Sequence, residues 1–288
     1  MSNFESLPNI LIEPAVRRAL EEDLGRAGDI TTDAVVSPSA TARAVIAARQ
    51  RGRIAGLDVA MAAFGLIDPS LALEPLCADG ALVAPGDALL RIEGPARGIL
   101  TAERVALNFL GHLSGVATAT HELVEAVAGT RARICCTRKT TPGLRAFEKY
   151  AVRAGGGVNH RFGLDDAILI KDNHIVAAGG IAPALKRAQA RAGHLAAIEI
   201  EVDTLDQLKE ALAAGARVVL LDNMPPDILR KAVALNAGVA VLEASGGVTL
   251  ETAPAIAATG VDFISVGRIT HSAPCLDIGL DFEELTAD

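Results

Sequence analysis

The second half of the chain alternates between short apolar runs and longer amphipathic stretches. Strands that are apolar along their whole length and alternate with helices are typical of a parallel sheet covered by helices on both faces. The pattern predicts consecutive βα units from Arg131 onward. The runs of strand length are Ala132–Cys136, Ala167–Ile170, Ala197–Val202, Arg217–Leu221, Val239–Leu242 and Val261–Val266. The amphipathic segments, rich in Ala and Leu, are Ile181–Ala192, Leu205–Ala214, Asp227–Asn236 and Leu250–Thr259.

Nearly every predicted strand ends in a polar or charged residue. Six runs are visible, so a barrel, complete or incomplete, competes with an open doubly wound sheet. An open sheet concentrates its ligand site at one switch point, whereas a barrel assembles its active site from the carboxyl ends of several strands. Because the polar residues are spread over all the runs, the pattern favours the barrel. They are Arg138, Lys139, Lys171, Asp172, Glu201, Asp222, Glu243, Ser245, Gly267 and Arg268.

The residues before this repeat have a mixed order of helices and strands, which predicts an α+β domain. We place this domain at residues 1–115 and the barrel at 116–269, and we expect that 270–288 can pack back onto the first domain. The predicted helices are Ile10–Leu24, Asp58–Ile67 and a long region at Arg97–Val127 with interruptions at Gly111 and Ser114-Gly115. The predicted strands are Ala42–Ala48, Leu71–Leu76 and Ala88–Ile92.

Composition narrows the class of protein. Half of the 288 residues are hydrophobic, yet no apolar run approaches the length of a membrane span, and the polar segment Met1–Pro8 does not resemble a secretory signal. The formal net charge of -8 and the absence of Trp disfavour a general nucleic-acid binder. The cysteines form neither a CxxC pair nor a disulfide-dense pattern, so we expect buried thiols and a cytoplasmic protein. They are Cys77, Cys135, Cys136 and Cys275.

A cationic stretch from Arg131 to Lys171 stands out in this acidic chain. Arg138, Lys139 and Lys171 follow predicted strands directly. Arg and Lys concentrated at strand ends indicate an anionic ligand that carries several carboxylates or phosphates.

Two glycine-containing loops follow the last two predicted strands, Ser245-Gly246-Gly247 and Val266-Gly267-Arg268. Glycine lets a ligand approach the backbone closely, and free backbone N–H groups bind anions. The loops after the last strands of a barrel often bind phosphate. Either loop alone would fit an ordinary turn, but the pair predicts a phosphate site.

Glu201 and Asp222 end consecutive predicted strands. They suit contact with sugar hydroxyls, with a hydrated metal or with developing positive charge, and the alternative is ion pairing with the cationic stretch. Strand alternation puts Glu199 on the same face as Glu201, one layer deeper. A buried carboxylate needs a partner, so we expect a Lys or Arg beside Glu199.

Lys171 admits a second interpretation. A Lys at a strand end, flanked by Ile168–Ile170, suits either an anion ligand or a Schiff-base lysine of a barrel aldolase. A third alternative is a non-catalytic carrier-like module, because Asp79–Asp87 resembles the hairpin of biotinyl domains; no lysine follows at the modification turn, so we interpret that hairpin as architecture.

Taken together, these residues resemble the type II phosphoribosyltransferases, and most closely the quinolinate phosphoribosyltransferase family. The resemblance covers essentially the whole chain, and its specificity lies in the order of the motifs. Arg268 departs from the small residue that family members often carry there. The motifs are Glu22-Asp23-Leu24, Gly28–Thr32, Glu103–Asn108, Leu113-Ser114-Gly115, Thr137–Thr140, Lys171–His174, Glu199-Ile200-Glu201, Leu221-Asp222-Asn223 and Ser245-Gly246-Gly247.

The resemblance implies an N-terminal α/β sandwich, an incomplete α/β barrel and a homodimer with a shared active site. It implies transfer of phosphoribosyl from phosphoribosyl pyrophosphate to quinolinate, with Mg²⁺ required, which yields nicotinate mononucleotide, pyrophosphate and CO₂. A related transferase that acts on another base is the alternative. We expect no PLP, thiamine or biotin, because a glycosylated ring nitrogen is itself cationic and stabilises the carbanion.

The resemblance also implies residue roles. Thr137, Arg138, His160, Arg161 and Lys171 are expected to hold the two carboxylates of quinolinate. Lys139 is expected to face pyrophosphate, with Mg²⁺ carried mainly by that substrate and no certain protein ligand. The remaining expectations are Arg104 arriving from the neighbouring subunit, Glu201 and Asp222 at the ribose and the transition state, and the 5-phosphate at Ser245, Gly246, Gly247, Val266, Gly267 and Arg268.

Overall fold

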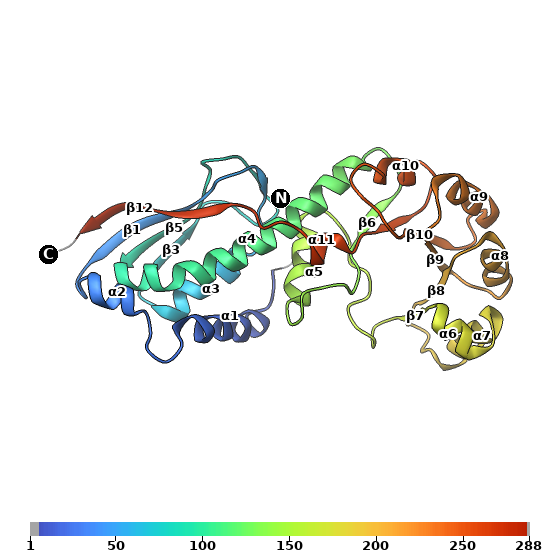
Figure 1. Ribbon diagram of the computed structural model, residues 1–288, viewed down its shortest axis with the longest axis horizontal. Helices are drawn as coiled ribbons and strands as arrows, with labels where there is room; N and C mark the ends of the chain where they lie inside the picture. The colour runs from blue at the N-terminus through green and yellow to red at the C-terminus, as the bar shows by residue number, and fades with distance from the viewer. Residues whose placement is uncertain (1–5, 287–288) are drawn as a thin grey trace. The chain divides into compact units, whose positions relative to one another are not determined.

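The structure is a computed structural model that describes residues 6–286, and it divides into two compact units (Figure 1). The first unit joins the chain up to His121 with Ala146–Gly156 and the residues from Ser272 onward. The second joins Glu122–Arg145 with Gly157–His271. Residues 1–5, part of the segment in which we see no secretory signal, lie outside the described residues.

Ala146–Gly156 groups with the first unit, which differs from the expected continuous barrel domain at 116–269. This segment lies in helix α5 (Arg145–Ala154). The Phe147 ring lies 6.0 Å from that of Phe109, and the Tyr150 hydroxyl donates a hydrogen bond of 2.5 Å to Asp79 Oδ2. Long-range contacts of this kind leave no periodic signal in the sequence.

The first unit contains a four-stranded antiparallel sheet in the order β12-β1-β5-β3. Its last strand comes from the end of the chain, because β12 pairs with β1 from Ala48↔Ile278 to Thr41↔Thr286. The strands are β1 (Thr41–Ala48), β3 (Ala72–Pro75), β5 (Ala88–Pro95) and β12 (Ile278–Thr286), with a separate pair β2 (Gly52–Arg53) and β4 (Leu82–Val83). The helices are α1 (Asn9–Leu24), α2 (Ile30–Val35), α3 (Leu57–Ile67) and α4 (Ala96–Ala126).

Helix α4 is continuous, so the predicted interruptions at Gly111 and Ser114-Gly115 are wrong. These glycines make room for the returning chain. A Cβ at Gly115 would lie 2.0 Å from the Pro274 carbonyl oxygen, and Leu276 N donates to Gly111 O at 2.9 Å. α4 is long, yet within residues 6–286 no helix combines the length and apolar character that crossing a membrane requires.

The second unit is built on a parallel sheet of six strands in the order β6-β11-β10-β9-β8-β7. β6 and β7 stand at its two ends, so the barrel is incomplete, and the predicted fold class is confirmed. All six predicted strands are present: β6 (Arg133–Cys135), β7 (Ile168–Ile170), β8 (Ile198–Val202), β9 (Val218–Asp222), β10 (Val241–Ser245) and β11 (Phe263–Ser265).

Helices between these strands bury their apolar stripes. α7 buries Leu185, α8 buries Leu208 and α9 buries Leu229, and each such side chain stabilises the fold by roughly 1.5–3 kcal/mol. At the start of α8, the Thr204 hydroxyl and the Gln207 side chain form a reciprocal capping box. The helices are α6 (Asp172–Ala178), α7 (Ile181–Arg191), α8 (Leu205–Ala213), α9 (Pro226–Asn236), α10 (Ala253–Ala257) and α11 (Arg268–His271).

α10 begins later than predicted, at Ala253 rather than at Leu250. Thr249 and Thr252 hydrogen-bond to each other through side chain and backbone, and this turn takes the place of the first helical turn. The loop at Gly246-Gly247 therefore does not run directly into a helix.

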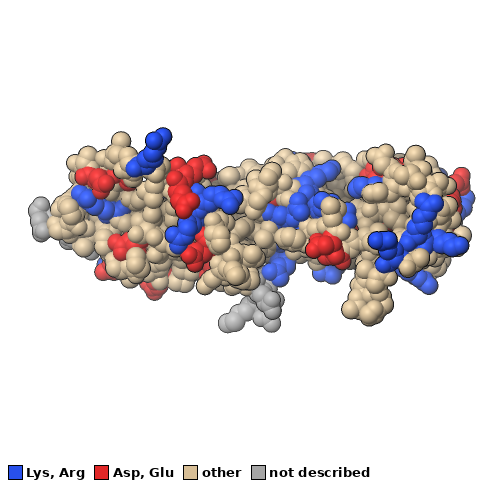
Figure 2. Space-filling model, turned by 90° about the horizontal axis from the view of Figure 1, so that it is seen from below, with Lys and Arg blue, Asp and Glu red and all other residues tan. Residues whose placement is uncertain are grey.

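Positive charge is locally concentrated in the second unit although the chain is acidic overall. On the face drawn in Figure 2, Lys and Arg side chains gather over the part of this unit where Figure 1 labels α6 and α7. α7 contributes Lys186, Arg187 and Arg191 to the surface of the unit.

Candidate active site

A pocket of about 760 Å³ opens in the second unit, lined by residues at and beyond the carboxyl ends of its strands. It brings together every predicted site residue except Arg104. Those residues are Thr137, Arg138, Lys139, His160, Arg161, Lys171, Glu201, Asp222, Ser245, Gly246, Gly247, Val266, Gly267 and Arg268. The lining that we did not predict comprises Leu169, Leu220, Asn223, Glu243, Val248, Thr249, Ser265 and His271.

Two arginines make one side of the pocket strongly cationic. The Nε atoms of Arg138 and Arg161 are buried and have no hydrogen-bond partner among the described residues. Burial, and then the neighbouring Arg138, lower the pKa of Arg161. Two half-buried arginines whose like charges repel each other favour an anion between them, because its charge relieves the repulsion and its oxygens accept hydrogen bonds from their N–H groups.

Lys171 and Glu201 form an ion pair at the ends of β7 and β8, with Lys171 Nζ 2.6 Å from Glu201 Oε2. The Lys171 side chain is 48% exposed, so its ammonium group remains accessible. The ion pairing that we weighed as the alternative for Glu201 is therefore present, and it coexists with exposure to the pocket.

Asp222 is the second carboxylate at this edge. Burial raises its pKa above the ordinary value, and the charges of Glu201 and Asp203 raise it further. Lys171 and a hydrogen bond from Asn223 act in the opposite direction. The ionisation of Asp222 therefore depends on its immediate neighbours.

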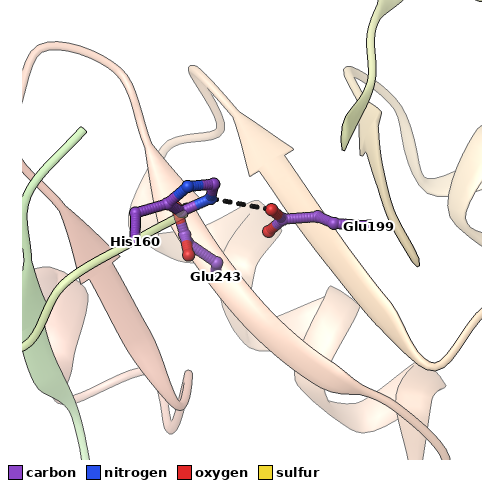
Figure 3. Close-up of side chains that lie close together, drawn as sticks. All are labelled: His160, Glu199 and Glu243. Atoms are coloured by element: carbon purple, nitrogen blue, oxygen red, sulfur yellow. Dashed lines mark hydrogen bonds and ion pairs between the residues drawn. The ribbon is translucent and has the colours of Figure 1, made fainter. Parts of the chain in front are cut away.

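Beneath the pocket, His160 bridges two buried carboxylates (Figure 3). Its Nε2 lies 2.8 Å from Glu199 Oε2 and 3.8 Å from Glu243 Oε1. Glu199 is 7% exposed and lies deeper than Glu201, as predicted. Its close partner, however, is this histidine and not the expected Lys or Arg. His160 lies in an irregular segment, two residues after Val158, which bridges to Cys135 of β6.

The same cluster is the part of residues 6–286 in which three metal-ligating side chains converge. Burial, and then the charge of Glu199, raise the pKa of Glu243 from 4.5 to about 7. Arg161 interacts electrostatically with Glu199. His160 and Arg161 therefore give the buried Glu199 carboxylate partners within the chain.

The two glycine loops also line the pocket. Gly246 and Gly247 both have positive φ, 99° and 60°, which favours glycine. At Gly267 a Cβ would lie 3.0 Å from Lys139 Cδ, so this glycine lets the Lys139 side chain pass. Thr270 Oγ1 donates to Lys139 O at 2.7 Å and fixes the backbone below that lysine.

Two protein-family models match this chain. Residues 116–281 match the family model described as quinolinate phosphoribosyl transferase, C-terminal domain. Residues 29–114 match the model for the N-terminal domain of the same family. The chain belongs to the quinolinate phosphoribosyltransferase family.

Individual relatives cover almost the full length. The chain is 47% identical over 260 residues to a probable nicotinate-nucleotide pyrophosphorylase (carboxylating) of Bacillus subtilis, with 90% of this chain and 89% of the relative covered. It is 48% identical over 273 residues to the nicotinate-nucleotide pyrophosphorylase (carboxylating) of Mycobacterium leprae, with 92% and 95% covered. The structure of the nicotinate-nucleotide pyrophosphorylase from Francisella tularensis superposes with a TM-score of 0.93 at 39% identity, with 98% and 100% covered.

Arg104, which the family resemblance assigns to the neighbouring subunit, lies on α4 in the first unit. Its side chain is 64% exposed and its ion pair with Glu103 is 3.9 Å long, which leaves the guanidinium group largely solvated. It does not line the pocket described above. Its assignment stays a prediction.

His174, in the motif that starts at Lys171, has a structural role. Its Nδ1 accepts a hydrogen bond of 2.9 Å from Lys171 N at the start of α6. His271, in contrast, lines the pocket from α11, and nothing in the sequence around it indicates a strand end or a motif. Glu243 was visible as a strand-end residue of β10, and Asn223 was visible in a family motif, but neither position alone indicated a place in the pocket.

Proposed function

We propose that this protein transfers the phosphoribosyl group of phosphoribosyl pyrophosphate to quinolinate and releases CO₂, forming nicotinate mononucleotide and pyrophosphate. The observation that carries the proposal is one pocket in which Arg138, Arg161 and Lys171 lie with two glycine loops and two carboxylates at the strand ends. Family membership with relatives 47–48% identical supports it.

The cationic side suits a pyridine that bears two adjacent carboxylates. Arg138 and Arg161 offer N–H groups that have no partner among the described residues, and Lys171 and His160 add donors at the pocket wall. Guanidinium groups bind carboxylates through paired hydrogen bonds, which orients the ring as well as holding it. We assign quinolinate to this side, with Thr137 beside it.

The two glycine loops suit a sugar phosphate. The 5-phosphate is assigned to the backbone N–H groups of the loops 245–247 and 266–268, where positive φ at Gly246 and Gly247 exposes the backbone. The Arg268 side chain lines the pocket and adds a cation there. Lys139, which passes Gly267, is assigned to the pyrophosphate.

In the first step, the bond between the anomeric carbon and the pyrophosphate oxygen breaks, and the pyridine nitrogen forms a bond to that carbon. The sugar carries positive charge as the old bond breaks. Glu201 and Asp222, at the ends of β8 and β9, are assigned to the ribose hydroxyls and to this charge. Lys139 stabilises the leaving pyrophosphate.

In the second step, the carboxylate next to the glycosylated nitrogen leaves as CO₂. The electron pair of the broken carbon–carbon bond remains on the ring, where the cationic nitrogen stabilises it, and a proton then bonds to that carbon. The chain's part is to orient the leaving carboxylate with Arg138 and Arg161 and to exclude water from the ring.

Mg²⁺ is proposed to enter as part of the phosphoribosyl pyrophosphate complex. Glu201 is already paired with Lys171, and in the His160 cluster Glu199 interacts with His160 and with Arg161. Neither arrangement is built to hold a divalent cation on its own. An ion bound to pyrophosphate would neutralise the leaving group, together with Lys139.

We further propose that the protein works in the cytoplasm as a homodimer in which Arg104 completes the site of the partner. Within the described residues no disulfide joins the four cysteines, which is consistent with a reducing compartment. Cys135 and Cys136 are buried as expected, whereas Cys77 is half-buried and Cys275 is exposed. The exposed guanidinium group of Arg104 is available to a second copy of the chain.

The test is an assay with quinolinate labelled in the carboxylate next to the ring nitrogen. With Mg²⁺ and phosphoribosyl pyrophosphate, labelled CO₂ and pyrophosphate should appear in equal amounts. Turnover of nicotinate or of a pyrimidine base without CO₂ release would assign the site to another base. Covalent trapping of a sugar phosphate on Lys171 by borohydride would replace the proposal with the aldolase alternative.

A further inference from the structure

Asn223 occupies an unusual backbone conformation directly after β9. Its φ is 52°, and within the described residues only Asn223 and Ala237 combine positive φ with a side chain. Asn tolerates the left-handed region better than most residues. Its backbone N–H donates to Ser245 O at 2.8 Å, which continues the pairing of Asp222 with Ser245 by one residue.

The Asn223 side chain joins two parts of the pocket. Its Nδ2 donates a hydrogen bond of 2.6 Å to Asp222 Oδ2. Its Oδ1 and Cγ lie over Gly246, where a Cβ would come within 2.0 Å and 2.6 Å of them. The amide therefore packs between the carboxylate at the end of β9 and the glycine loop at the end of β10.

We propose that Asn223 is a positioning residue that ties the Asp222 carboxylate to the loop at Gly246. Resting on the proposed function, the inference is that one amide sets both the place of the 5-phosphate and the direction of the carboxylate toward the ribose. Gly246 is required by this arrangement, because any side chain there would displace the amide.

The charges around Asp222 make its pKa sensitive to the hydrogen bond from the Asn223 amide. Glu201 and Asp203, from β8 and the residues after it, raise the pKa of Asp222, and so does burial. Lys171, from the end of β7, and the Asn223 hydrogen bond lower it. Loss of that hydrogen bond removes one of the two groups that favour the ionised carboxylate.

Two substitutions separate positioning from turn formation. Asn223→Gly accepts positive φ and removes the amide. Asn223→Asp keeps the size and the tolerance for positive φ, but it replaces the donor with a second negative charge beside Asp222. Ala237→Gly is the matched control, because it makes the same backbone change at the end of α9, outside the pocket lining.

The experiment measures kcat, KM for phosphoribosyl pyrophosphate and the pH dependence of kcat/KM for the parent and the three variants. Asn223→Gly should lower kcat/KM by roughly 10- to 100-fold, as loss of a preorganised contact does. The acidic limb of the profile should move to higher pH, further for Asn223→Asp than for Asn223→Gly. Ala237→Gly should leave all three quantities unchanged.

Unchanged kinetics in both Asn223 variants would overturn the inference. So would a fall in thermal stability with an unmoved acidic limb, since that is the behaviour of a turn residue alone. If the parent itself releases no labelled CO₂, the proposed function fails. The affinity for Mg²⁺–phosphoribosyl pyrophosphate, measured by calorimetry, then tests the inference. The inference holds if Asn223→Gly weakens this binding and Ala237→Gly does not. It fails if Asn223→Gly and Ala237→Gly both bind this ligand as tightly as the parent does.

Discussion

At the scale of residues, the pocket keeps opposite charges close together and partly compensated. Lys171 pairs with Glu201, and His160 lies between Glu199 and Glu243. The charge of Arg138 repels that of Arg161, and the charge of Glu199 attracts it. Carboxylates therefore compensate part of the positive charge of Lys171 and Arg161. This arrangement makes single substitutions informative.

Lys171→Ala should lower kcat/KM by on the order of 10²-fold or more, because a charged contact to the substrate is lost and Glu201 is left unpaired. Steady-state kinetics with both substrates checks this. Lys209→Ala is the control, since Lys209 makes a surface ion pair with Asp206 on α8 and should be neutral. Full activity of Lys171→Ala would remove this lysine from the site.

Glu243 gives a prediction about stability and pH. Because its pKa is raised from 4.5 to about 7, the folded protein retains a proton in that interval which the unfolded chain has released. The free energy of unfolding must then fall as pH rises through this window. Glu243→Gln cannot titrate, so its stability should fall less over the same interval.

Denaturant unfolding at several values between about pH 5 and pH 8 measures the effect. Glu125→Gln, at an exposed position on α4, serves as the control and should follow the parent. Parallel pH dependence of the parent and Glu243→Gln would show that Glu243 titrates normally.

At the scale of elements, α4 and the chain that returns over it form a close contact. Gly115→Ala should destabilise the protein by about 1–3 kcal/mol, because its Cβ would collide with the Pro274 carbonyl oxygen. Gly65→Ala is the matched control, since Gly65 lies in α3 with nothing within 4 Å of an added Cβ. Gly65→Ala should raise the free energy of unfolding by roughly 0.5–1 kcal/mol, because Ala has the higher helix propensity. Urea unfolding distinguishes them, and equal effects would contradict the contact.

The elements also show what the sequence could predict and what it could not. β9 was predictable because a buried parallel strand needs apolar residues along its length, and β8 showed the period-two alternation of a strand. Glu201 and Asp222 followed from the ends of these strands. The continuity of α4 was not predictable, because glycine is needed at position 115 to make room for the carbonyl group of Pro274, which is distant in the sequence. The partner of Glu199 was also missed, since His160 comes from an irregular segment that has no helix or strand periodicity.

At the scale of the whole molecule, Mg²⁺ should be needed for turnover of the substrate and should not contribute to the stability of the folded protein. Removal of Mg²⁺ with a chelator should abolish turnover while leaving the thermal midpoint of the substrate-free protein unchanged. A midpoint that falls on chelation would instead indicate a resident ion that stabilises the native state, with the His160 cluster as its candidate site.

The assembly of the protein decides whether its site is complete within one chain. Mixing Arg104→Ala with Lys171→Ala tests this directly, since each variant alone lacks one proposed contact in every site. In a mixed dimer with shared sites, one site combines the intact Lys171 of the first chain with the intact Arg104 of the second, and the other site lacks both. Activity should therefore return on mixing, toward about half that of the parent per mixed dimer if the sites are independent.

Subunit exchange must be verified, for example by mass spectrometry of differently tagged chains. Activity that stays at the level of the separate variants after complete exchange would mean that Arg104 acts within its own chain or not at all.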